Sequence, residues 1–89
     1  MVFMVIEKFR RDPKAVYRRF REKGRQMPEG LDYVDSWVAA DFSRCFQVMR
    51  CEDVTLLQRW VAQWCDLAEF EIIPIAPGGQ TAAALTEHL

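Results

Sequence analysis

The sequence predicts an α+β domain of the ferredoxin-like class, with the element order strand, helix, strand, strand, helix, strand. The apolar residues alternate between the period of a strand and that of a helix in this order along 89 residues. A chain of this length folds as one domain. Two right-handed crossovers then give a four-stranded antiparallel sheet in the order 4-1-3-2, with both helices on one face.

The first third of the chain predicts a strand followed by a helix. Residues 2–9, VFMVIEKF, form a nearly continuous apolar run that is typical of a central strand. Asp12 followed by Pro13 is the pattern of a helix N-terminus, and Gly24 is suited to the helix end. We therefore expect a helix between Asp12 and Gly24.

The middle of the chain predicts a β-hairpin. Residues 31–40 and 44–51 both alternate in the manner of strands, and Asp41-Phe42-Ser43 provides the tight connection between them. A glycine-containing turn, Met27-Pro28-Glu29-Gly30, precedes the first of these strands.

The last third of the chain predicts a second helix and a fourth strand. Asp53 is a candidate N-cap, and an apolar stripe follows at helical spacing: Leu57, Trp60, Val61 and Trp64. Residues 68–75 read as a strand whose Pro74 suits a sheet edge. We expect a ferredoxin-like domain over residues 1–76, and a tail over 77–89 that forms a loose helical turn or frays.

The alternation of side chains along each strand predicts which residues the helices leave uncovered. We assign the purely apolar sets, such as Met4 with Ile6 and Phe46 with Val48, to the face under the helices. The open face then combines apolar and polar residues: Phe3, Val5, Glu7, Tyr33, Asp35, Trp37, Gln47, Met49, Glu71 and Ile73. A patch of this kind favours association.

Two such faces packed against each other predict a homodimer that encloses a pocket. Its candidate ligand-binding residues are the polar and aromatic ones, together with one methionine: Glu7, Tyr33, Asp35, Trp37, Gln47, Met49 and Glu71. An interior filled by the protein's own side chains is the alternative. Each carboxylate would then pair with an Arg or a backbone donor, or bridge the interface.

Several segments resemble an uncharacterised family of short bacterial proteins that is known as a domain of unknown function. The resemblance covers roughly residues 1–75 and rests on MVFMVIEKF, YRRF, PEGLDYVDSW and RCFQVM. That family is similar in fold to the dimeric α+β barrel superfamily. The resemblance implies a fold and a dimer formed by pairing of the sheets, and it does not imply a reaction.

The catalytic members of that superfamily carry residues that this chain lacks. The monooxygenases use an Asn with a Trp, and the haem enzymes need an axial His. This sequence contains no Asn, and its only histidine is His88 in the tail. No catalytic residue can therefore be carried over from the resemblance, and we expect no cofactor.

Two functions remain open from the sequence. The first is binding of a small, largely apolar molecule between the two sheets, or a role as an interaction module alone. The alternative is a cofactor-independent enzyme, isomerase-like or monooxygenase-like, in which a pocket carboxylate transfers a proton and acts together with Tyr33 and Trp37. The candidate carboxylates are Glu7, Asp35 and Glu71. Burial beside Trp37 would raise the pKa of such a carboxyl toward neutrality.

Charge and composition argue against other partners. Residues 1–30 hold nine Lys and Arg against four Asp and Glu, which is typical of a solvated helix face or of a phosphate-binding surface. The strand at 44–51 lacks the glycine of RNA-recognition modules, and Phe46 is expected under the helices, so we expect no nucleic acid. No apolar run reaches the roughly 20 residues of a membrane span.

The cysteines predict the compartment. Cys45, Cys51 and Cys65 are odd in number and have no CxxC spacing, so neither a disulfide framework nor a metal site is expected. The N-terminus has no signal-peptide pattern. We therefore expect a cytoplasmic protein.

Overall fold

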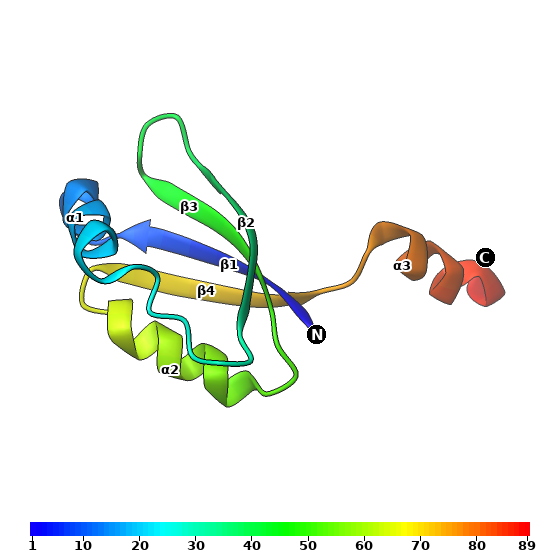
Figure 1. The fold of residues 1–89 in the computed structure, drawn as a ribbon. Coiled ribbons are helices and arrows are strands. Elements are labelled where there is room, and N and C mark those ends of the chain that lie inside the picture. Colours follow the sequence, from blue (N-terminus) through cyan, green and yellow to red (C-terminus); the bar gives the residue numbers. More distant parts are fainter.

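The computed structural model describes residues 1–89 as one four-stranded antiparallel sheet with two helices on one face (Figure 1). Its strands are β1 (Val2–Phe9), β2 (Asp32–Val38), β3 (Arg44–Arg50) and β4 (Ala68–Ile75), in the order β2-β3-β1-β4. This is the predicted order read from the opposite edge, so the predicted fold class is confirmed. Pro74 lies on the edge strand β4, where its missing N–H interrupts no pairing on the outer side.

Both helices begin at the aspartates that the sequence indicates. Helix α1 spans Pro13–Lys23, and the Asp12 carboxylate accepts a hydrogen bond of 2.9 Å from the Lys14 backbone N–H. Helix α2 spans Val54–Trp64, and the Asp53 carboxylate accepts one of 2.9 Å from the Thr55 backbone N–H. Each cap satisfies an N–H that has no partner inside the helix.

The core lies between α2 and the sheet. Leu57, Trp60 and Trp64 of α2 are buried against apolar side chains of the two central strands. The Trp60 ring meets the Phe70 ring of β4 edge-to-face, with 5.4 Å between the ring centroids. The buried cluster consists of Phe3, Val5, Leu31, Met49, Cys51, Leu57, Trp60 and Trp64.

The prediction of which face the helices cover was wrong for the two central strands. The register aligns Phe3 with Met49, Val5 with Gln47 and Glu7 with Cys45, and all six side chains are buried on the helix side. The open face of β1 and β3 consequently carries Met4, Ile6, Phe46 and Val48. Apolar content did not decide the orientation, because both faces of these strands are rich in apolar residues.

The outer strand β2 changes face in its middle. Tyr33 lies opposite Met49 on the helix side, but a register shift between Tyr33 and Asp35 turns Asp35 and Trp37 to the open face. The Tyr33 and Ser36 hydroxyl oxygens, both on the helix side, are 2.6 Å apart in a hydrogen bond. Such a bulge cannot be recognised from alternation alone, because the extra residue breaks the period of two.

Helix α1 is attached to the rest of the domain through the partly buried Val16, which packs against the core, and through Arg19. None of its residues is buried. The Arg19 guanidinium donates two hydrogen bonds, of 2.8 and 2.7 Å, to the Asp66 carboxylate just after α2, and a third to the Gln63 carbonyl. This paired geometry joins the two helices at the surface and leaves space between α1 and the sheet.

The tail is helical and lies away from the domain. Helix α3 (Gly78–Leu85) and a 3₁₀ turn (Thr86–His88) extend beyond the end of β4, and all their residues are exposed (Figure 1). No helix of the chain combines the length and the apolar content that crossing a bilayer requires.

Candidate functional site

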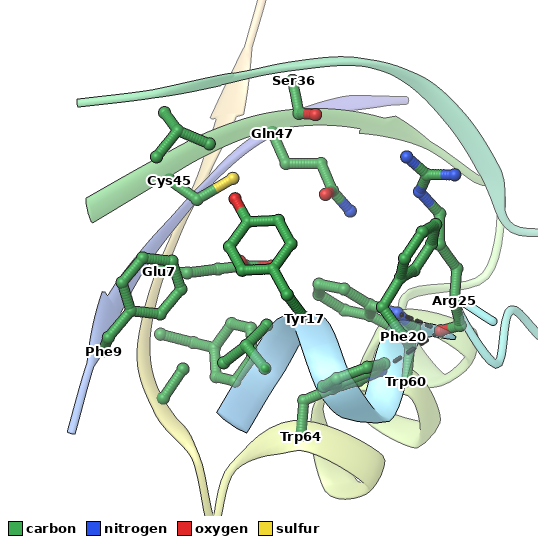
Figure 2. A pocket seen from close by; sticks show the side chains of 14 residues that line it. Glu7, Phe9, Tyr17, Phe20, Arg25, Ser36, Cys45, Gln47, Trp60 and Trp64 are labelled. Atoms are coloured by element: carbon green, nitrogen blue, oxygen red, sulfur yellow. Dashed lines mark hydrogen bonds between the residues drawn. The ribbon is translucent and has the colours of Figure 1, made fainter. Parts of the chain in front are cut away.

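A cavity of about 110 Å³ lies between α1, α2 and the sheet (Figure 2). Ten of its 14 lining residues are hydrophobic. The lining residues Tyr17, Phe20 and Val38 are exposed, so the cavity opens between α1 and the outer strand β2. The residues lining its deeper part come from the central strands and α2, including Glu7, Cys45, Gln47, Trp60 and Trp64.

Glu7 is the ionisable carboxyl of this cavity. Its side chain is on the helix face of β1, and the residue is only 8% exposed. Burial raises the pKa of Glu7 from its ordinary value of 4.5 to about 7, although a hydrogen bond with the Cys45 thiol and the charge of Arg25 both lower it. Near neutral pH the carboxyl is therefore about equally populated in its protonated and ionised forms.

Cys45 and Tyr17 stand close to this carboxyl and stay neutral. Burial and the nearby Glu7 charge raise the pKa of the Cys45 thiol to about 12. Burial also raises the pKa of Tyr17, and the neighbouring Cys45 and Glu7 groups raise it further. In Figure 2 the Tyr17 hydroxyl points from α1 toward Cys45. These groups thus offer the cavity a weak thiol donor and a phenol donor.

Arg25 borders another part of the cavity, and its backbone is fixed. The Arg25 carbonyl accepts hydrogen bonds from both indole N–H groups of α2, at 3.0 Å from Trp60 and 3.1 Å from Trp64 (Figure 2). Gly24 permits this path, because its φ of 68° turns the chain back toward α2 directly after the helix. Two buried indole donors therefore anchor the residue that carries the cationic side chain.

The Arg25 guanidinium lies over two aromatic rings and forms no ion pair. Its central carbon lies 3.7 Å from the centroid of Tyr33 and 4.9 Å from that of Phe20. It takes part in none of the four ion pairs of the structure, and its N–H groups donate to no protein acceptor. Ring stacking leaves these N–H groups, which lie in the guanidinium plane, available to a ligand.

Gln47 is the remaining polar group of the cavity. It is 6% exposed, and its amide nitrogen donates to the Met49 sulfur at 3.3 Å. No fully buried polar side-chain atom of the protein lacks a hydrogen-bond partner. The atoms of Gln47 and Glu7 that bond to nothing in the protein are therefore accessible from the cavity.

The residues expected to form one pocket are divided between the two faces of the sheet. Glu7 and Gln47 line the cavity, and Tyr33 stacks on the Arg25 that borders it. Met49 is fully buried in the core and is not part of the cavity wall. Asp35, Trp37 and Glu71 lie on the opposite face. The expectation that these seven side chains share one side was therefore wrong.

Sequence reasoning missed most of the cavity wall, including Tyr17, Phe20, Arg25 and Cys45. The sequence feature that could have indicated a cavity under the helices is the presence of Glu7 and Gln47 in the two central strands of the sheet. A polar residue buried in a central strand either has a partner or faces a site.

His, Cys, Asp and Glu side chains form no group of three or more that could hold a metal ion. The cavity wall itself offers one carboxyl and one thiol, Glu7 and Cys45.

The open face of the sheet is a second candidate site. Trp37, Phe46 and Ile6 are neighbours in one row across the strands, and Val48, Met4 and Ile73 are neighbours in the next. Charged side chains surround this apolar centre: Lys8, Asp32, Asp35, Arg44, Arg50, Glu69 and Glu71. Trp37 is 56% exposed. An apolar centre with a charged rim is typical of a protein–protein interface.

Comparison with known proteins gives a family and no function. A family model described as "Domain of unknown function (DUF3303)" matches residues 1–89, which includes the tail. No curated protein and no solved structure shows significant similarity to the chain.

Replacing Glu7 by Gln should change how stability depends on pH. Because the folded pKa of about 7 lies above the ordinary value of 4.5, the unfolded chain binds fewer protons between these values, and stability falls as the pH rises through them. Gln has no such titration. We expect the free energy of unfolding of Glu7→Gln, relative to the wild type, to rise by about 2–3 kcal/mol from pH 5 to pH 8.

Urea unfolding at the two pH values measures this difference. Glu22→Gln, which removes an exposed carboxylate of α1, is the matched control. If the relative free energy of unfolding of Glu7→Gln changes between the two pH values by no more than that of the control, the Glu7 carboxyl is solvated.

Proposed function

This chain belongs to the DUF3303 family, a domain of unknown function, and from its geometry we propose that it is a homodimer whose protomers each bind a small, largely apolar molecule. The binding site of the proposal is the cavity between the helices and the sheet. The observation that carries it is that Glu7 and Gln47, buried in the two central strands, face unfilled space.

The energetics of Glu7 favour a site over a structural role. Raising a carboxyl pKa from 4.5 to about 7 corresponds to about 3 kcal/mol lost when the group ionises inside the protein. An apolar residue at this position would avoid that cost. Strongly shifted groups in a cavity are typical of functional sites, where the chemistry of the group compensates for lower stability.

The cavity also sets the size of the ligand. Its volume of about 110 Å³ is somewhat below the roughly 150 Å³ of an engineered protein cavity that binds benzene. A molecule of about six or seven non-hydrogen atoms fits, with part of it at the opening beside Tyr17 and Phe20. The proposed site thus lies inside each protomer, not between the two sheets, because the polar residues expected between the sheets face the helices.

The open face supports the homodimer. Its apolar centre of two rows would stay in contact with water in a monomer, and contiguous exposed apolar side chains with a polar rim mark association surfaces. Acidic and basic groups both occur on its rim, including Glu69 and Glu71 from β4 and Arg44 from β3. A second copy related by a two-fold axis can therefore meet the same face with opposite charges aligned.

Filling the cavity should weaken binding. Cys45 is 7% exposed and faces the cavity, so Cys45→Leu places extra carbon atoms in it. Cyclopentanone, an uncharged probe of the right size, should shift the indole N–H resonances of Trp60 and Trp64 in the wild type, with a Kd of about 1–10 mM. The same titration of Cys45→Leu should weaken binding at least about tenfold.

Cys65→Leu is the control, because Cys65 is exposed at the end of α2. Wild-type indole resonances that stay unchanged with cyclopentanone, with isovaleramide and with isovalerate would contradict binding in the cavity. Equal binding by Cys45→Leu would place the ligand elsewhere.

Placing a charge on the open face should separate the dimer. In Trp37→Glu a carboxylate replaces an exposed indole of the apolar centre, so each association would bury two additional charges. We expect the dimer Kd to rise at least about 100-fold. Sedimentation at micromolar and nanomolar concentrations measures it, with Val54→Glu as a control on an exposed site of α2. A wild type that is monomeric at micromolar concentration contradicts the homodimer.

A cofactor-independent isomerase is the second candidate function, and the pKa of Glu7 favours it. A carboxyl that titrates near 7 is suited to removing a proton from carbon at neutral pH and returning it to the same molecule. Neutral Tyr17 and Cys45 stand beside it as donors to the oxygen of an enolate. Asp35 and Glu71, the other two carboxylates considered for this role, lie on the open face and cannot serve the cavity.

Exchange of carbon-bound protons tests this activity directly. Cyclopentanone in D₂O should exchange its α-protons faster in the presence of the protein, with a rate that rises with pH up to about 7, as Glu7 ionises. Glu7→Gln should lower the rate at least about 100-fold. Glu71→Gln should not change it. Equal rates with the wild type and Glu7→Gln would exclude Glu7 as the base.

A further inference from the structure

We propose that the natural ligand of the cavity is a small apolar monocarboxylate, whose carboxylate is bound by the Arg25 guanidinium and whose apolar body lies against the aromatic wall. This inference rests on the proposed small-molecule function and deepens it by naming the ligand class. It is carried by the placement of an unpaired cation at the edge of an otherwise apolar cavity.

The structure holds Arg25 in place without an ion pair to its guanidinium, whose charge acts on Glu7 only at a distance, by lowering the pKa of that carboxyl. Its carbonyl is fixed by the Trp60 and Trp64 indoles, and its guanidinium is stacked on Tyr33 and Phe20. The other partly buried arginine of this region is Arg19, whose guanidinium is already paired with the Asp66 carboxylate by two hydrogen bonds. Arg25 has the same planar set of donors and no acceptor, which matches the geometry of a carboxylate from outside the protein.

The remaining polar groups are compatible with an anion. The Gln47 amide lies on the sheet between Glu7 and Arg25 in Figure 2, within the same cavity wall. The Glu7 carboxyl is the one acidic group of the wall that would repel a carboxylate, and its protonated form removes that repulsion. A guanidinium, an amide and a carboxylic acid around one small space form a set of donors.

The rest of the wall selects the ligand's body. The deep surface consists of Trp60, Trp64 and Phe70, which offer no acceptor and no charge to the cavity. Together with the volume of about 110 Å³, this favours a compact branched or cyclic hydrocarbon group. Phosphates and dicarboxylates are disfavoured, because their second charge would be buried without a partner.

Binding of an anion should be coupled to protonation of Glu7. The charged and titratable groups around Glu7 are Cys45 from β3, Tyr17 from α1 and Arg25 from the segment after α1. The pKa of Glu7, about 7, lies between pH 6 and pH 8.5, whereas that of the Cys45 thiol is about 12. A carboxylate in the same low-dielectric space favours the protonated form of Glu7, so affinity should fall as the pH rises above 7.

Isovalerate and its amide, isovaleramide, test the ligand class because they share one shape and differ in charge. Binding to the wild-type protein is followed at the indole N–H resonances of Trp60 and Trp64. At pH 6 we expect isovalerate to bind at least about tenfold more tightly than isovaleramide. The Kd of isovalerate should rise about tenfold between pH 6 and pH 8.5 in the wild type. In Glu7→Gln, whose amide cannot ionise, this Kd should be the same at both pH values.

Arg25→Gln should weaken binding of isovalerate at least about tenfold and weaken binding of isovaleramide by a smaller factor, because the amide carries no charge for the guanidinium to pair with. Arg18→Gln, at an exposed position of α1 without ion pairs, is the control. If Arg25→Gln fails to fold, the comparison of the two ligands on the wild type still decides. Equal binding of amide and carboxylate overturns the ligand class and leaves the proposed function standing. Indole resonances that respond to neither ligand nor to cyclopentanone overturn both.

Discussion

The register between β1 and β3 is the constraint on which the rest of the structure depends. It pairs Phe3 with Met49, Val5 with Gln47 and Glu7 with Cys45, and so places all six side chains under the helices. The first part of this face packs on Leu57 and forms the core. The part around Glu7 is polar. Helix α1, which lies over it, buries none of its residues, whereas α2 buries three against the core.

The attachment of α1 follows from this division. None of its residues is fully buried. Val16 packs against the core, Arg19 pairs with Asp66, and the Arg25 carbonyl just after the helix accepts from two indoles. Because these contacts lie beside the cavity and not across it, Tyr17 and Phe20 stand at an opening. The same indoles that complete the core thus position a cation at the cavity. Stability and the candidate site are built by one set of side chains.

The sheet has two unlike faces, and each supports a different proposal. The helix face contains the cavity and its single buried carboxyl, whose pKa of about 7 suits proton transfer or pairing with a bound acid. The open face has an apolar centre around Phe46 and Met4 with charges at its rim, and it suits a second copy. The cavity opens on the helix side, so association through the open face would leave it accessible.

The sequence by itself determined the element order, the strand neighbours and both aspartate caps, because these depend on local periodicity and on the short reach of Asp12 and Asp53. Only the tertiary structure decided which face of β1 and β3 meets the helices. Both faces of these strands are apolar enough to be core. Because Glu7 and Gln47 are polar, sequence reasoning assigned their face to the open side of the sheet, which was wrong. The bulge after Tyr33 and the position of Arg25 depend on contacts between segments that are distant in sequence. No local sequence pattern therefore predicts them.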